Sequence, residues 1–322
     1  MSSRALSYLI FGAGLVVIEL LDLMPALLAG LASYMALDLT ERGLIAAGAR
    51  RSISRVAAVT VFLLLAGGIA WVFGAFAGVG VARLPELIDT VLPRLSALAD
   101  TWGYNFPVEN ARELRDLVVT TAKANVQQLG KTSGIVTREF AHLLVGVFIA
   151  ILRFLSPSSA TRPATNLFES IAVAVEERAH RFVRSFERVV GAQVMISIVN
   201  TVVTAIFLYA MDFPFRNFLI LTTFVCGLVP ILGNLVSNTV IVAAGLINSV
   251  QLAVIGLVFL VVIHKLEYVL NSRIVGGSID TPMWVTLLGL LAGEALMGVP
   301  GVLIAPAMLH YLRDELRDLP PR

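Results

Sequence analysis

The stretch MWVTLLGLLAGEALMGVPGVLIAPAMLHYL, residues 283–312, decides how the chain folds. It is apolar almost throughout, yet it is longer than the roughly 20 residues that one straight helix needs to cross the hydrocarbon core. Gly298, Pro300 and Gly301 interrupt it near its middle. Non-helical backbone at membrane depth survives only where protein or water covers it. The stretch therefore predicts two half-length helices that meet at a buried or cavity-lining turn.

The composition of the whole chain agrees with a membrane location. Of 322 residues, 57% are hydrophobic and 14% are charged, whereas a soluble domain usually has about 25% charged residues. This excludes a cytosolic enzyme, a secreted disulfide scaffold and a disordered chain. A net charge of +2 gives no reason to expect a nucleic-acid partner. With one cysteine, Cys226, and four scattered histidines, neither an internal disulfide nor a metal site is predicted, and no cofactor is expected.

The other apolar runs predict the rest of the membrane region. Runs at 5–18 and 23–37 are each short of a full span, so a tight helical hairpin is the simplest interpretation. The first run resembles a signal peptide, but no clear cleavage site precedes a polar mature chain, which favours a retained membrane segment. Further spans are predicted at 56–81, 140–155, 190–210, 217–232, 236–250 and 252–270.

Two segments between the spans are amphipathic. In residues 82–138, apolar side chains recur every three or four positions and basic residues roughly balance acidic ones, which predicts a small external helical domain. Residues 165–189 carry several arginines beside an apolar stripe, which predicts an amphipathic helix on the cytoplasmic surface or against the bundle. The predicted fold class is an all-α polytopic membrane protein with about eight transmembrane helical segments, including short or re-entrant hairpins.

The predicted domains follow from these segments. N-terminal transmembrane helices occupy residues 1–81, the external helical domain residues 82–138, and a C-terminal permease core residues 139–322. Basic residues gather in cytoplasmic loops of membrane proteins. Their distribution predicts that the N- and C-termini are cytoplasmic and that residues 82–138 lie on the opposite side.

The chain lacks the motifs of the obvious enzyme classes. Gly130-Lys131-Thr132 resembles the end of a phosphate-binding loop, but Asn125 stands where that loop needs its first glycine. The metalloprotease string HExxH is absent, no GxGD turn occurs, and no serine is paired with a histidine by its spacing. An enzyme is therefore not expected.

Polar side chains at membrane depth form the candidate site. A charge there costs at least about 2.5–3.5 kcal/mol on insertion scales, so it is usually paired, interfacial or functional. Glu294 has no neighbouring cation in the sequence, which predicts that it faces an aqueous cavity or pairs with a distant cation such as Arg273. Lys265 and Glu267 lie at the end of a span. They either form an interfacial ion pair that anchors the helix or belong to the pathway.

A second break in the apolar pattern adds backbone groups. Pro230 removes a backbone donor and Gly233 loosens the helix, so carbonyls freed here would bind a cation or a polar solute. An ordinary loop between two spans is the alternative. The candidate substrate or ion pathway combines both breaks with the polar side chains: Glu267, Arg273, Glu294, Pro230, Gly233, Asn234, Gly298, Gly301 and Lys265.

The C-terminal half carries a distinctive set of motifs: the turn Leu228-Val229-Pro230-Ile231-Leu232-Gly233, Glu267 with Arg273-Ile274-Val275-Gly276, and then Pro282, Gly293, Gly298, Gly301 and Pro306. With these motifs the chain resembles a known family, the autoinducer-2 exporter (AI-2E) family of bacterial permeases. Four residues depart from the family pattern: Ser272 and Asn234 where proline is common, and Asp280-Thr281 where leucine and histidine are usual. The departures bear on the substrate more than on the fold.

This resemblance implies a permease of the bacterial inner membrane that assembles as a homo-oligomer, a pentamer in family members. It also implies export of a small solute such as the signal autoinducer-2, or exchange of a monovalent cation for a proton. We therefore expect a secondary transporter with a small-molecule or ion substrate, which gates its C-terminal half around a midplane site. A passive channel and a non-transporting scaffold that binds a partner through residues 82–138 are the alternatives.

Overall fold

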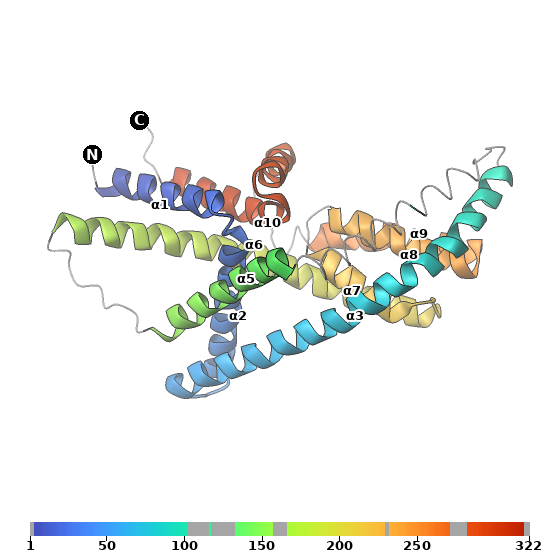
Figure 1. The fold of residues 1–322 in the computed structure, drawn as a ribbon, viewed down its shortest axis with the longest axis horizontal. Helices are drawn as coiled ribbons and strands as arrows, with labels where there is room; N and C mark the ends of the chain where they lie inside the picture. Colours follow the sequence, from blue (N-terminus) through green and yellow to red (C-terminus); the bar gives the residue numbers. More distant parts are fainter. Residues whose placement is uncertain are drawn as a thin grey trace. The chain divides into compact units, whose positions relative to one another are not determined.

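A computed structural model describes residues 3–101, 116, 133–156, 166–228, 232–270 and 282–318 (Figure 1). Every regular element in these ranges is an α-helix, as a bilayer demands of a chain that must satisfy its own backbone hydrogen bonds. The helices are α1 (Ser3–Leu20), α2 (Met24–Ala46), α3 (Arg51–Thr101), α5 (Ser133–Leu155), α6 (Leu167–Ala210), α7 (Arg216–Gly227), α8 (Leu232–Asn248), α9 (Val250–Leu270) and α10 (Met283–Arg317).

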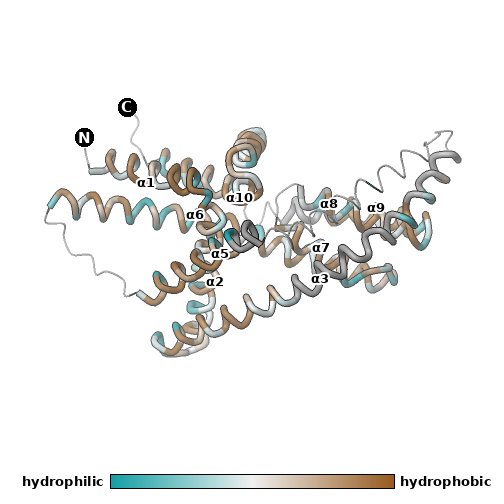
Figure 2. The backbone as a smooth tube through the Cα atoms, viewed as in Figure 1, coloured by the Kyte–Doolittle hydropathy of each residue, from teal (hydrophilic) through white to brown (hydrophobic). Residues whose placement is uncertain are grey.

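These helices confirm an all-α polytopic membrane protein. Three of them, α3 within Arg51–Trp71, α6 and α10, contain segments long and apolar enough to cross a membrane. The pair α1 and α2 passes the same test but is bent by 117° at its break, and α5, α7, α8 and α9 contain shorter apolar helices. Hydrophobic residues run along much of their length (Figure 2). Large apolar side chains such as Leu64 and Trp71 are exposed on the chain, as expected where lipid is the neighbour.

Asp22 forms the break between α1 and α2. Its φ is 55°, in the left-handed region, and the N–H of Leu23 donates to the carbonyl of Ile18 over 2.8 Å. Pro25 lies in the first turn of α2, where its missing N–H would have no helical acceptor. The predicted tight hairpin is thus a turn through 117°, short of a full reversal.

The chain divides into two compact units. Unit 1 contains Met1–Gly67, Thr137–Ala192 and Ser278–Arg322, and unit 2 contains Gly68–Val136 and Gln193–Gly277. α3 and α6 each pass from one unit into the other. α3 also continues without a break across residues 81–82, the predicted boundary of the external domain. Most of residues 102–132 lie outside the described ranges, so the external domain stays a prediction.

Unit 1 is held together by an aromatic core and a close helix contact. Phe182 of α6 meets Phe11 of α1 and Tyr311 of α10 with ring centroids 5.9 and 5.7 Å apart, both edge to face. On the other side, Gly146 of α5 lies against α2. A Cβ on Gly146 would stand 2.1 Å from the carbonyl oxygen of Ala26. Only glycine allows the two helices to approach this closely.

Unit 2 is built on α7, α8 and α9. Leu208, Phe213, Ile241 and Leu260 are buried members of its core. α8 and α9 meet at a short turn in which Ser249 accepts a hydrogen bond from the N–H of Leu252 over 3.1 Å, the contact expected of an N-cap serine. The spans predicted at 217–232, 236–250 and 252–270 correspond to these three helices.

Candidate functional site

α10 reverses direction at Gly298. This glycine has φ 62° and ψ −142°, outside the helical region. A Cβ on Gly293 would lie 2.6 Å from the carbonyl oxygen of Gly301, and one on Gly289 would lie 2.5 Å from the side chain of Leu309. Residues 20 apart in a straight helix are separated by about 30 Å. The two limbs of α10 therefore pack against each other, which confirms the pair of half-length helices predicted for this stretch.

Glu294 lies on the first limb, one turn before the reversal, and its side chain is exposed. Leu291 and Leu287, which precede it on the same face of this limb, are 65% and 40% exposed, so the carboxylate stands on an apolar exposed surface. No hydrogen bond or ion pair joins Glu294 to any residue within the described ranges. Arg273, its predicted distant cation, lies outside those ranges, so that pairing stays a prediction.

The second predicted break lies between α7 and α8. Pro230 is outside the described residues. Gly233 is buried, and a Cβ on it would stand 1.6 Å from the carbonyl oxygen of Cys226, while Asn234 is half-buried. The carbonyl of Gly227 accepts a hydrogen bond from the side-chain amide of Gln193 over 2.7 Å. Similarly, the hydroxyl of Ser197 in α6 donates a hydrogen bond to the carbonyl of Phe224 over 2.8 Å. These two carbonyls at the end of α7 already have protein donors.

The polar residues at the end of α9 are only partly placed. Lys265 is exposed in α9, and no ion pair joins it to a residue in the described part of the chain. Glu267 belongs to the same helix, but its side chain is not described. The interfacial ion pair and the pathway role therefore both stay open for these residues.

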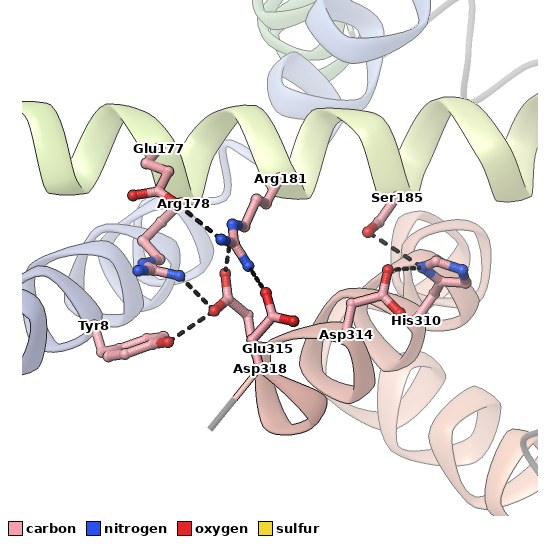
Figure 3. Close-up of polar contacts among 9 residues, drawn as sticks. All are labelled: Tyr8, Glu177, Arg178, Arg181, Ser185, His310, Asp314, Glu315 and Asp318. Carbon is pink, nitrogen blue, oxygen red and sulfur yellow. Dashed lines mark hydrogen bonds and ion pairs between the residues drawn. The ribbon is translucent and has the colours of Figure 1, made fainter. Parts of the chain in front are cut away.

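A buried ionic cluster in unit 1 was not predicted (Figure 3). Arg178 of α6 forms an ion pair with Glu315 of α10, and the two side chains are 3% and 5% exposed. The Tyr8 hydroxyl of α1 donates to the same carboxylate over 2.7 Å. The Arg178 guanidinium also lies 4.5 Å from the centre of the Tyr8 ring, within cation–π range. Three helices thus meet around one buried carboxylate.

The cluster continues along α6 toward its C-terminal end. Arg181 donates to Glu177 over 2.8 Å and also binds Asp318. One helical turn further, Nδ1 of the buried His310 lies 3.3 Å from the Ser185 hydroxyl. The same Nδ1 also lies 3.4 Å from a carboxylate oxygen of Asp314, and Nε2 on the other side of the ring lies 3.5 Å from Arg188.

Comparison with known proteins decides the family. Residues 6–318 match the model of the family described as AI-2E family transporter. The chain belongs to the AI-2E transporter family. It is also 29% identical over 138 residues to a protein of Bacillus subtilis (strain 168) named "Putative transport protein YdbI", an alignment that spans 42% of this chain and 39% of that protein. The family and the multi-pass membrane class expected from the sequence are thereby confirmed.

In this AI-2E family transporter the buried cluster and the α10 hairpin have different properties. The pair at the centre of the cluster, Arg178 and Glu315, is buried and joins two helices, so removing one partner would leave an uncompensated buried charge. The hairpin carries an exposed carboxylate with no described partner, beside a break in the helix. Because charge at membrane depth is costly unless it is used, the hairpin is the better candidate for contact with a transported ion or solute.

Proposed function

We propose that this AI-2E family transporter is a secondary transporter of the bacterial inner membrane that exchanges a monovalent cation for a proton. The observation that carries the proposal is the exposed Glu294 on the broken helix α10. A carboxylate takes up either a proton or a metal cation, and the two compete for the same oxygens. That competition is the basic requirement of an exchanger with one site.

The backbone around Gly298 supports the same role. Pro300 has no N–H to give to the carbonyl of Leu296, four residues earlier. The carbonyl of Leu296 therefore lacks this helical donor, and the partial negative charge of such a carbonyl favours a cation. Broken helices with this arrangement form the ion sites of many transporters.

The environment of Glu294 supports a wet or covered surface. Placing an ionised carboxylate in contact with hydrocarbon costs about 2.5–3.5 kcal/mol on insertion scales. The exposed leucines on the same face do not offset that cost. We infer that this face of α10 borders a water-filled pathway in the working homo-oligomer, with the N- and C-termini in the cytoplasm.

Flux measurements test the proposal. Wild-type protein and the Glu294→Gln variant are each reconstituted in vesicles loaded with a pH dye. Both are challenged with pulses of sodium or potassium. Asp212→Asn is the matched control, because Asp212 is an exposed carboxylate at the turn between α6 and α7. We expect cation-driven proton movement in wild type and in the control and its loss in Glu294→Gln. Undiminished proton movement in Glu294→Gln would contradict the proposed site.

The other outcomes separate the alternatives. If wild type moves no protons, export of a small polar solute such as an autoinducer-2-like signal becomes the leading function, and labelled-solute efflux tests it. Cation flux without proton movement indicates a passive channel. A scaffold would show neither flux, and would lose its partner when residues 84–136 are deleted.

A further inference from the structure

A cavity of about 420 Å³ lies in unit 1 and is lined by residues of α1, α2, α5 and α6. Its volume is within the range of small-molecule sites, about 300–1,000 Å³. Most of its lining is apolar, for example Leu27, Leu31, Ala150 and Val183. The proposed transport reaction makes no use of it.

The charged lining residues of this cavity gather at one end. Arg153 lies in the last turn of α5, and its Nη2 is 3.2 Å from Oε1 of Glu176 on α6. His180 completes the group, with Nε2 3.6 Å from the same oxygen. All three side chains are about half exposed. This end of the cavity is therefore polar and open.

The rest of the cavity follows α5 away from the charged end. Val145 and Ile149 line it at four-residue intervals before Arg153, so the stripe extends about 12 Å along the helix. These two side chains are 50% and 57% exposed, which shows that the cavity opens on the outer, apolar face of α5. An occupant must be apolar along α5 and charged beside Arg153. A membrane phospholipid meets both requirements.

We propose that this cavity binds one acyl chain of a phospholipid whose headgroup joins a phosphate to a primary ammonium. Arg153 has guanidinium N–H groups to give to the phosphate beyond the one that meets Glu176. Both contacts of the Glu176 carboxylate use Oε1, which leaves Oε2 to accept from the ammonium. An anionic headgroup without an ammonium would place negative charge against Glu176, and a quaternary ammonium has no hydrogen to donate.

Lipid binding is measured on delipidated full-length protein. Phosphatidylethanolamine, phosphatidylglycerol or phosphatidylcholine is titrated in, and native mass spectrometry counts the lipids retained per chain. We expect one phosphatidylethanolamine per chain, bound about tenfold more tightly than the other two lipids. Arg153→Gln and Glu176→Gln should each remove most of this preference, because each deletes one charged hydrogen-bonding partner.

Two further variants test whether the lipid binds in this cavity. Ala179→Trp places a large side chain in the cavity and should abolish retention of the lipid. Arg138→Gln is the control: Arg138 lies on the same helix and is paired with Asp22 at 3.3 Å, but it does not line the cavity, so binding should be unchanged.

Three results would overturn the proposal. These are equal binding of the three lipids, retention of lipid by Ala179→Trp, or the same loss in Arg138→Gln. If a second copy of the chain covers the cavity instead, Ala179→Trp will alter the oligomer mass and leave the lipid count unchanged. Because the readout is the lipid count and not flux, this test stands or fails independently of the proposed exchange.

Discussion

Arg178 and Glu315 form an ion pair across 137 residues of sequence, and both side chains are almost completely buried. The pair joins the first half of α6 to the second limb of α10. Tyr8 adds α1 to the same carboxylate. A single buried carboxylate oxygen, Oε2 of Glu315, thus connects three helices.

Glu315→Gln should strongly destabilise the protein. It leaves the buried Arg178 guanidinium without a counter-charge, and breaking one side of a buried pair typically costs about 3–5 kcal/mol. The unfolding midpoint in detergent should fall accordingly, and the double variant Arg178→Met/Glu315→Leu should recover much of the loss. Glu177→Gln is the control, since Glu177 is half exposed and should matter by less than about 1 kcal/mol. Equal losses in Glu177→Gln and Glu315→Gln would contradict this account.

Gly301→Ala should open the α10 hairpin. Its Cβ would stand 1.9 Å from the carbonyl oxygen of Gly293, so the limbs must separate, at a cost of about 1–3 kcal/mol. Gly12→Ala is the matched variant in α1, where nothing lies within 4 Å, and it should be neutral or stabilising by about 0.5–1 kcal/mol. Thermal unfolding in the same detergent compares the two. A stabilised Gly301→Ala protein would show that the limbs are not in contact.

Gln193→Leu should weaken the packing of α6 against the C-terminal end of α7. The substitution keeps the side-chain size but leaves the Gly227 carbonyl without its donor, at a cost of about 1–3 kcal/mol. Thr60→Val is the control, because the exposed Thr60 hydroxyl bonds within its own helix. Amide hydrogen exchange over α7 should accelerate in Gln193→Leu alone; unchanged exchange there would contradict the prediction.

Asp212→Asn should change stability by no more than about 0.5 kcal/mol. Its ion pair with Arg216 is exposed, and pairs of this kind contribute little. Asp212 also has φ 49°, a left-handed conformation that asparagine adopts as readily as aspartate. Thermal unfolding of the variant checks this, and a loss above about 1 kcal/mol would mean that the turn depends on the charge.

The reversal in α10 was predictable because its cause is local. Gly298, Pro300 and Gly301 interrupt an apolar run that is too long for one span, and the structure places the break at Gly298. The spans that became α7, α8 and α9 were predicted for the same reason. Each is a short apolar run bounded by turn residues.

The buried cluster was not predictable by this route. Arg178 and Arg181 belong to a segment rich in both charges, which the sequence identifies only as an amphipathic helix on the cytoplasmic surface or against the bundle. Whether such a face meets water or another helix is decided by tertiary packing, here with residues more than a hundred positions away. A spacing signal did exist: Arg178 and Arg181 are one turn apart on α6, as are Glu315 and Asp318 on α10. This matching spacing predicts ion pairs only once the two helices are known to be neighbours.

The distance in sequence between Arg178 and Glu315 also has a consequence for biosynthesis. At about 5–20 residues per second, a ribosome needs on the order of ten seconds to add the 137 residues that separate them. Throughout that interval the guanidinium of a nascent α6 has no permanent counter-ion, so it must stay hydrated or with a temporary partner. The first half of α6 therefore settles into its final position late, after α10 has emerged.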